Sequence, residues 1–343
     1  MYKDHKIVCC TAAGRMRYMQ YIFPYVLGSD IVDRYDIWVN TVNMCDIEFF
    51  RQMAAGNSKV NLVWQPDGIV DGINSINKFY ENCQDDDTVY VKIDDDIIWM
   101  QPNIIEKIVA FRFENLDAFL VSPMVINNAI CTYIWQVKGH IKLDKYYPAR
   151  SNEKVLWKRG AFAKELHEWY LSQMEKDASF WKQLKTDDVP VACNRFSINF
   201  ILWFGRDMKL LNGNIPGDDE EYLSSVAPVK LSKYNTFDGN AVISHFAFGP
   251  QRQILDGTDI LQRYGKLCEQ YFAMHQPQQS VWDDVCKAKE YVSMHYDDIM
   301  KQESPYSTVN KSLGKRVKRE YKQRQKLITY YFEKILGKQY HIG

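Results

Sequence analysis

The chain has 343 residues, with 43 Lys and Arg against 43 Asp and Glu, so its formal net charge is zero. Balanced charge argues against a general nucleic-acid binder, which needs a basic surface. The length is sufficient to bury a large core, either as one α/β domain or as a domain with appendages. Aromatic residues make up 14% of the chain, which hints only weakly at a sugar site because most aromatic residues are core.

The sequence predicts a cytoplasmic protein. Residues 1–6 are polar, and no apolar run approaches the length of a membrane span. Eight cysteines are scattered without a CxxC pair. We expect them to be reduced and structural, and we do not expect a zinc site.

Strands alternate with helices over the first hundred residues. We expect strands at 5–13, 35–40, 60–64 and 88–93, and helices at 16–26, 46–55 and 73–83. This order predicts βαβ units and a parallel sheet.

Gly14, Arg15 and Arg17 follow the first predicted strand. Glycine lets a ligand approach the backbone, and arginine can bind phosphate with two nitrogens, so this turn is a candidate for nucleotide binding. The other interpretation is a strand-to-helix turn with solvated arginines. The Lys-Ser pair and the spacing of a P-loop are missing. Asp67, in the turn after the third strand, is a further nucleotide-binding candidate.

Three consecutive aspartates, Asp94, Asp95 and Asp96, stand between the apolar strand at 88–93 and a second apolar run at 97–100. A solvated acidic turn would not be followed at once by apolar residues. Mg²⁺ and Mn²⁺ bind carboxylate oxygens and leave positions open for phosphate. Ligands of open α/β sheets bind at the carboxyl ends of strands. We therefore interpret the triplet as a metal and phosphate site.

The stretch Lys92-Ile93-Asp94-Asp95-Asp96-Ile97 resembles the DxD motif of GT-A glycosyltransferases, and the order of the preceding strands and helices fits the same family. In that family the motif holds a divalent metal against the diphosphate of a nucleotide sugar. The resemblance implies an α/β fold of the GT-A (Rossmann-like) kind, with a mixed, mainly parallel sheet flanked by helices. It implies Asp94 and Asp96 as metal ligands, with Asp94 and Asp95 also near the nucleotide.

The resemblance also implies a catalytic domain over residues 1–275, of which 1–100 binds the nucleotide and 101–275 the acceptor. An aromatic-rich insertion at 130–185 either shapes the acceptor site or packs a helical subdomain. We expect a short strand at 207–211. A break rich in Gln and Pro at 275–279 separates a helical, basic extension at 280–343.

A second acidic cluster, Asp218-Asp219-Glu220-Glu221, opens a predicted helix. Acidic residues there stabilise the helix dipole, which is one explanation. The other is a general base that accepts the proton of an acceptor hydroxyl. Inverting GT-A enzymes carry an acidic motif at this point, so the resemblance makes Asp219 the first catalytic candidate and Asp218 the second. Inversion is favoured, and retention stays open.

His245 ends an apolar strand, and Arg252 follows a Gly-Pro turn. A histidine at this place can be a satisfied core residue. Many GT-A enzymes, however, supply a late histidine as a metal ligand, and neutral imidazole suits Mn²⁺. The resemblance therefore implies His245 as a ligand, and Arg252 is a phosphate candidate.

The last segment, 311–343, is basic, and its apolar residues recur at near-helical spacing. Such a helix can lie on an anionic membrane surface, or pack on the catalytic domain or a partner helix. Membrane contact would place the protein peripherally at the inner face of the membrane and suit a lipid-linked glycan acceptor.

These observations lead to the hypothesis of a glycosyltransferase that depends on Mn²⁺ or Mg²⁺. It would move a hexose from a nucleoside-diphosphate sugar to a glycan hydroxyl in bacterial-type surface polysaccharide synthesis. One alternative is a sugar-nucleotide nucleotidyltransferase, although Ala12-Ala13-Gly14-Arg15 is a poor version of the glycine-rich basic signature of that class. The other is a non-catalytic glycan-binding or scaffold protein.

Overall fold

The computed structural model of the chain describes residues 1–308 and residue 342. Its strands are β1 (Lys6–Ala13), β2 (Arg34–Val39), β3 (Val60–Val63), β4 (Ile69–Val70), β5 (Thr88–Ile93), β6 (Ile97–Met100), β7 (Ala118–Ile126), β8 (Val189–Ala192), β9 (Phe200–Phe204), β10 (Tyr234–His245) and β11 (Ser307–Thr308).

The helices are α1 (Met16–Leu27), α2 (Met44–Gly56), α3 (Ile73–Ile76), η1 (Asn77–Asn82), α4 (Ile104–Glu114), α5 (Ala129–Lys138), α6 (Gly160–Lys176), η2 (Phe180–Leu184), α7 (Gly205–Lys209), α8 (Asp219–Glu221), η3 (Tyr222–Val226), α9 (Ala227–Lys230), α10 (Arg252–Leu255), α11 (Ile260–Ala273), α12 (Gln276–Met294) and α13 (Tyr296–Met300).

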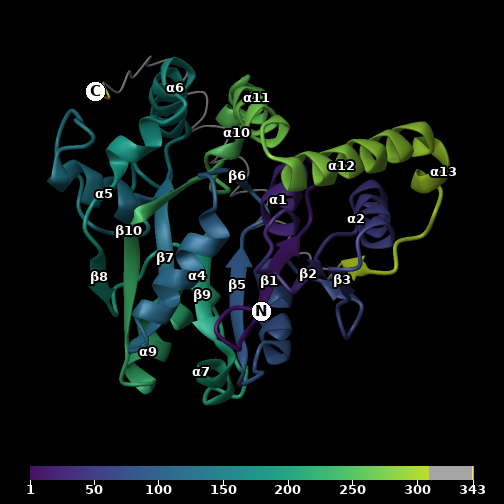
Figure 1. Cartoon of the computed structure of the whole chain (residues 1–343), viewed down its shortest axis with the longest axis horizontal. Helices are drawn as coiled ribbons and strands as arrows, with labels where there is room; N and C mark the ends of the chain where they lie inside the picture. Colours follow the sequence, from purple (N-terminus) through teal and green to yellow (C-terminus); the bar gives the residue numbers. More distant parts are fainter. Residues whose placement is uncertain (309–341, 343) are drawn as a thin grey trace, which may run out of the picture.

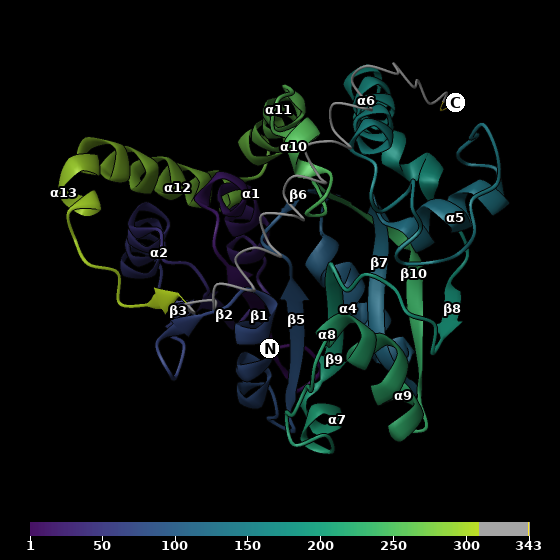
Figure 2. The same ribbon diagram turned by 180° about the vertical axis from the view of Figure 1, so that it is seen from behind.

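A nine-stranded sheet forms the centre of the molecule, in the order β3-β2-β1-β5-β9-β7-β10-β6 with β8 beside β10. Strands β3, β2, β1, β5, β7 and β10 run in one direction, whereas β9, β6 and β8 run against their neighbours. Helices lie on both faces: α4 crosses the front in Figure 1, and α8 and α9 cross the front in the reverse view of Figure 2. The predicted Rossmann-like class, a mixed and mainly parallel sheet flanked by helices, is confirmed.

This topology explains why functional side chains can meet. Since β1, β5 and β10 run in the same direction, the loops after Ala13, Ile93 and His245 emerge at one edge of the sheet. The short antiparallel strand β6 returns from the aspartate turn and pairs with the end of β10, placing Ile97 opposite His245. The aspartates and the histidine are thus brought together by backbone pairing.

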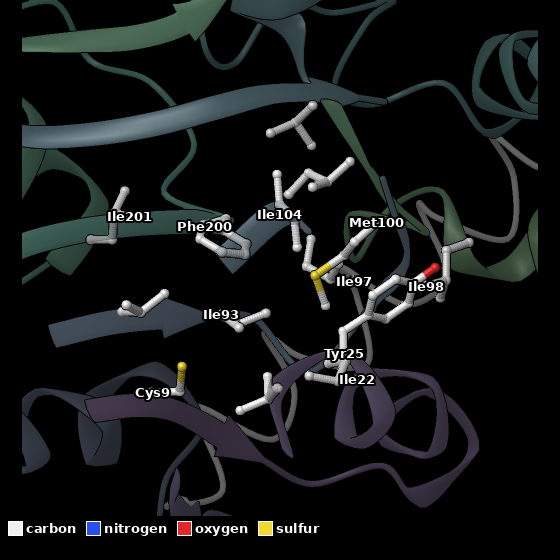
Figure 3. Close-up of a cluster of buried hydrophobic side chains, with 14 of the residues drawn as sticks. Cys9, Ile22, Tyr25, Ile93, Ile97, Ile98, Met100, Ile104, Phe200 and Ile201 are labelled. Carbon is white, nitrogen blue, oxygen red and sulfur yellow. The ribbon is translucent and has the colours of Figure 1, made fainter. Parts of the chain in front are cut away.

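Apolar strands buried on both faces build the core. All six residues of β5 and all five of β9 are buried, because both strands lie in the middle of a sheet that helices cover on both faces. Figure 3 shows one cluster in which side chains of three neighbouring strands contact β6 and two helices: Cys9, Ile93, Phe200, Ile201, Ile97, Ile98, Met100, Ile22, Tyr25 and Ile104. Each large apolar side chain buried here stabilises the fold by about 1.5–3 kcal/mol.

Helix α12 packs across α1 and α2 (Figure 1). Tyr21 stacks on Trp282 with ring centroids 5.9 Å apart. Further on, Tyr306 accepts a hydrogen bond of 2.7 Å from the backbone of Gln65, and β11 pairs in parallel with β4. Residues 276–308 therefore lie against the first third of the chain. The division into domains near residue 275 stays a prediction.

Two local predictions are wrong. Residues 207–211 form no strand, because the chain turns at Gly205 into α7, where Lys233 binds both carboxylate oxygens of Asp207 at 2.7 Å. The expected break at 275–279 is limited to residues 274 and 275, between α11 and α12, because α12 begins at Gln276 with a proline in its first turn, a position that proline favours.

The predicted basic helix at 311–343 falls, apart from residue 342, outside the described residues. Within the described part of the chain, no helix has both the length and the apolar character that a membrane span needs.

Gly205 provides a test of this packing. A Cβ at Gly205 would overlap the backbone of Asp85, just before β5, whereas a Cβ at Gly56 would meet nothing within 4 Å. We expect Gly205→Ala to destabilise the fold by about 1–3 kcal/mol through overpacking. Gly56→Ala, at the end of α2, should leave stability unchanged or raise it by up to about 1 kcal/mol. Thermal unfolding of the two variants measures this, and equal melting temperatures would contradict the packing described here.

Candidate active site

A cavity of about 640 Å³ opens at the carboxyl ends of β1, β5 and β10. Its walls carry six basic and six acidic side chains together with one histidine: Arg15, Lys92, Lys154, Lys158, Arg195, Arg252, Asp94, Asp95, Asp96, Asp218, Asp219, Glu220 and His245. The positive and negative side chains are equal in number, so the formal charge of the cavity wall sums to zero although many charged groups lie close together.

Most of the residues predicted from the sequence line this cavity: Arg15, Asp94, Asp95, Asp96, Asp218, Asp219, His245 and Arg252. Two do not. Arg17 turns away on α1 and binds Asp256, with 2.9 Å between Nη2 and Oδ1. Asp67 lies on the surface turn before β4 and pairs with Lys78. The structure therefore does not bring Arg17 and Asp67 to the cavity with the other predicted residues, because both side chains are held by partners outside it.

Asp95 ties the turn after β1 to the turn after β5. Its Oδ2 accepts hydrogen bonds from the backbone nitrogen of Gly14 at 3.0 Å and from Nε of Arg15 at 2.9 Å, and its Oδ1 binds Nη2 of the same arginine. The paired guanidinium contact is the strong, two-point geometry of arginine with a carboxylate. Asp95 thus fixes the position of Arg15 and leaves Asp94 and Asp96 on either side of it.

Asp96 is buried at the meeting point of three cationic or basic groups. One oxygen lies 3.3 Å from Nε2 of His245, and the other accepts from Arg15 at 3.1 Å and from Arg252 at 2.8 Å. Burial alone would raise the pKa of Asp96, but the charges of His245, Arg15 and Arg252 together outweigh burial and hold this pKa well below its usual range. Asp96 is therefore ionised at every physiological pH.

Lys92 lies inside the buried strand β5 and reaches the first aspartate. Its Nζ is 2.5 Å from Oδ1 of Asp94, and the amide of Asn199 donates to the other oxygen at 3.4 Å. Burial would lower the pKa of Lys92, but the carboxylates of Asp94 and Asp219 outweigh burial and raise it. A charged lysine in a core strand was not predicted as functional, although its place between apolar residues was the visible signal.

Arg195 binds three of the four carboxylates of the second acidic cluster. Its guanidinium binds Asp218 and Glu220 at 2.8 Å each, and Glu221 at 3.1 Å. Asp218 also accepts a hydrogen bond of 3.2 Å from the backbone nitrogen of Glu221, so it caps α8 and the dipole explanation holds for this residue. Burial raises the pKa of Glu220, although Arg195 opposes the shift.

Asp219 is the carboxylate of this cluster that Arg195 does not bind. It is buried, and it accepts hydrogen bonds from Tyr80 at 3.2 Å and from the backbone of Glu220 at 3.0 Å. An acid that keeps proton-accepting capacity beside a cavity is the arrangement that a general base needs.

The donor atoms at Asp96 and His245 fit a divalent cation. Nδ1 of His245 faces the carbonyl oxygen of Asn127 at 3.4 Å, and a carbonyl can only accept, so this nitrogen carries the hydrogen. In the neutral tautomer with this hydrogen, Nε2 presents its lone pair on the side of Oδ1 of Asp96, so a cation bound there would take both atoms as ligands. Imidazole with carboxylate suits Mn²⁺.

The protein supplies only part of a coordination shell. Among residues 1–308 and 342, no three His, Cys, Asp or Glu side chains are arranged so that they could hold a metal ion. The cation would therefore depend on ligands from the substrate, as Mg²⁺ and Mn²⁺ sites that bind phosphate do.

A buried polar network supports the loop that carries His245 and Arg252. The amide of Asn127 donates to the carbonyl of Phe246 at 3.0 Å and to Gln251 at 2.9 Å. His167, fully buried on α6, places Nε2 at 2.9 Å from the same carbonyl and Nδ1 at 3.0 Å from the hydroxyl of Tyr264. The insertion thus holds one wall of the cavity from behind.

The insertion at 130–185 packs a helical subdomain and also lines the cavity, and its part in an acceptor site stays a prediction. Most of its aromatic side chains pack inside the helical subdomain, such as Trp135, whose indole donates to the carbonyl of Leu184 at 2.7 Å. Trp157, by contrast, lines the cavity. Helical periodicity could not predict the position of Trp157, because this residue lies in the irregular connection between α5 and α6.

Comparison with known proteins adds little. No family model and no curated protein matches the sequence. Among solved structures, one similar chain is CMP:2-keto-3-deoxy-manno-octonic acid synthetase complexed with CTP. It is 12% identical with a TM-score of 0.37, and the match covers 78% of this chain and 98% of that one.

The predicted glycosyltransferase activity is corrected on this finding. The chain found is named a synthetase, and the comparison provides no support for sugar transfer or for a DxD motif. A similarity at this level does not transfer an activity, so the function has to be argued from the cavity itself.

His167 makes the support network sensitive to acid. Burial lowers its pKa to about 4, from about 6.5 in the unfolded chain. The unfolded state therefore binds more protons between these values, and stability falls as pH falls from about 6.5 to 4, by about 3 kcal/mol in total. Asp46 and Asp238, whose pKa values burial raises to about 6, act in the opposite direction.

Two variants measure how much of this pH dependence of stability comes from His167. Because His167→Gln removes only one of these groups, the free energy of unfolding should decrease less between pH 6.5 and 4.5 than it does in the wild type. His295→Gln, which changes an exposed histidine at the end of α12, should keep the wild-type slope. Denaturant unfolding at several pH values measures this, and identical slopes for all three proteins would disprove the assignment.

Proposed function

We propose that this chain is a metal-dependent transferase of sugar-nucleotide chemistry. Its cavity binds a nucleoside polyphosphate, and its reaction is the transfer of a nucleotidyl group to a sugar. The observation that carries the proposal is the convergence of Arg15 and Arg252 on the buried carboxylate of Asp96, beside His245, where two parallel strands end. Ligands of open α/β sheets bind at such strand ends.

The charge balance of the cavity supports a phosphate ligand that arrives with a cation. Six basic and six acidic side chains already neutralise one another, so a polyphosphate alone would bring uncompensated negative charge to a partly buried site. A divalent cation that enters with the phosphates restores the balance. We infer that Mn²⁺ or Mg²⁺ and the nucleotide bind together.

Asp96 and His245 are the residues that would hold the cation, and the phosphates of the nucleotide would supply its further ligands. When bound, the cation supplies Lewis-acid stabilisation of the negative charge that develops on the phosphates. Arg15 and Arg252, which now bind Asp96, are the guanidinium groups positioned to bind phosphate oxygens. Asp95 keeps Arg15 oriented for that contact.

In the proposed reaction an oxygen of the sugar attacks the α-phosphorus of a nucleoside triphosphate. The new phosphorus–oxygen bond forms as the bond to the β-phosphate oxygen breaks, and pyrophosphate leaves. When the attacking group is a hydroxyl, its proton goes to Asp219, the buried carboxylate of the second cluster that Arg195 does not bind. Lys92 is charged and buried close to Asp94 and Asp219, so it lessens the repulsion between these two carboxylates.

A paired substitution tests nucleotide binding. We expect Asp96→Asn to weaken Mn²⁺-dependent binding of nucleoside triphosphates by about 100-fold or more, because losing a metal ligand costs at least as much as losing a residue that supports one. Asp67→Asn, which changes an exposed aspartate outside the cavity, is the matched control and should bind as the wild type does. Calorimetric titration with each of the four common triphosphates provides the measurement.

The products that the same protein preparation forms identify the type of reaction. Pyrophosphate release that requires both a sugar and Mn²⁺ supports nucleotidyl transfer, and Asp219→Asn should lower its rate. Absence of triphosphate binding in the wild type, or unchanged binding in Asp96→Asn, would refute the proposal.

A further inference from the structure

Residues 152–158, just before α6, form a helical turn along one wall of the cavity. The backbone nitrogen of Trp157 donates to the carbonyl of Glu153 at 3.0 Å, which is the i to i−4 hydrogen bond of an α-helix. Residues three and four positions apart share one face of such a turn. Lys154, Trp157 and Lys158 are therefore neighbours, and all three line the cavity.

The turn is held firmly against the rest of the protein. Oε2 of Glu153 accepts hydrogen bonds from the backbone nitrogens of Val155 and Leu156 at 2.5 and 2.8 Å. The side chain of Leu156 is buried, and its carbonyl accepts from Gln251 at 3.3 Å. Gln251 belongs to the network behind His245, so the turn and the metal-ligand candidate share one support.

The two lysines carry the free positive charge of the cavity. Both are exposed, and within residues 1–308 neither makes an ion pair or a hydrogen bond through its side chain. The other basic groups of the wall are each bound by a carboxylate: Arg15, Lys92, Arg195 and Arg252. An anionic group entering the cavity meets no competing carboxylate at Lys154 and Lys158.

An aromatic surface connects these lysines with the acidic centre. The ring centroids of Trp157 and Phe248 are 5.9 Å apart, and those of Phe248 and His245 are 4.5 Å apart. All three side chains line the cavity. Flat aromatic faces provide apolar contact to a ring-shaped ligand, while charged groups at the margin fix its orientation.

We propose that the sugar substrate of this site is anionic and binds along this turn. Its ring lies against Trp157, and its phosphate or carboxylate group binds Lys154 and Lys158. The inference takes the presence of a sugar substrate from the proposed function, and it takes the charge of that substrate from the two unpaired lysines. The two ligands then occupy different parts of one cavity: the sugar lies at the turn, and the nucleotide phosphates lie at Arg15 and Arg252.

Binding measurements on the full-length chain test the inference. Glucose, galactose and mannose are each compared with their 1-phosphates and their uronic acids by calorimetry, with and without Mn²⁺ and a nucleoside triphosphate. We expect at least one anionic sugar to bind about tenfold more tightly than its neutral parent, which is what two partly screened ion pairs provide. Comparing phosphates with uronic acids distinguishes the two anionic groups.

Two double variants assign the effect to the turn. Lys154→Ala with Lys158→Ala should remove the preference for the anionic sugar, and replacement of both lysines by arginine should restore it. Lys142→Ala with Lys145→Ala changes two exposed lysines of the same connection that do not line the cavity, so it should keep the preference while altering the net charge equally.

The outcomes separate this inference from the proposed function. If triphosphates bind but no anionic sugar binds better than its neutral parent, the inference fails and the proposed function stands. The inference also fails if the preference survives without Lys154 and Lys158. If triphosphates do not bind at all, the proposed function fails, while an anionic preference that depends on the two lysines would still identify an anionic-sugar site.

Discussion

The ionised carboxylate of Asp96 is the point on which the site depends. It is almost fully buried, and a buried charge is tolerated only when it is paired. Three groups from separate parts of the chain provide that pairing: Arg15 after β1, His245 at the end of β10, and Arg252 at the start of α10. The sheet brings these groups together because β1 and β10 run in the same direction. The pairing of the buried Asp96 charge therefore depends on the topology of the sheet.

Division of labour among the carboxylates follows from their partners. Asp95 is fully engaged by Arg15 and the backbone of Gly14, and its task is positional. Asp218 and Glu220 are neutralised by Arg195. Within residues 1–308, Asp94 and Asp219 are bound by no arginine, so their oxygens can serve a ligand or accept a proton, whereas Asp96 is paired with Arg15, Arg252 and His245. Chemically identical side chains in two acidic clusters thus acquire different functions through the cations that reach them.

The central part of the site could be predicted from the sequence because it depends on local rules. A buried strand followed by three aspartates, and a second strand ending in histidine, are sufficient to expect a meeting at the carboxyl edge of a parallel sheet. Arg195 could not be predicted, since its three carboxylate partners lie 23 to 26 residues away, beyond β9 and α7. Arg17 and Asp67 had suitable chemistry, but their side chains point to partners elsewhere.

The acidic motif does not specify the reaction. A short acidic motif after a strand describes a cation and phosphate site, and several reactions of sugar nucleotides use such a site, so the motif could not select glycosyl transfer over nucleotidyl transfer. The sequence likewise could not predict the position of Lys154, Lys158 and Trp157, which lie between α5 and α6. They were visible as residue types, but only the folded turn places them on one face of the cavity.

Anomalous diffraction from crystals grown with Mn²⁺ and a nucleoside triphosphate tests the central claim most directly. The account predicts a manganese peak between Asp96 and His245, with the phosphates contacting Arg15 and Arg252. A peak at another place, or phosphates bound away from these four residues, would contradict it.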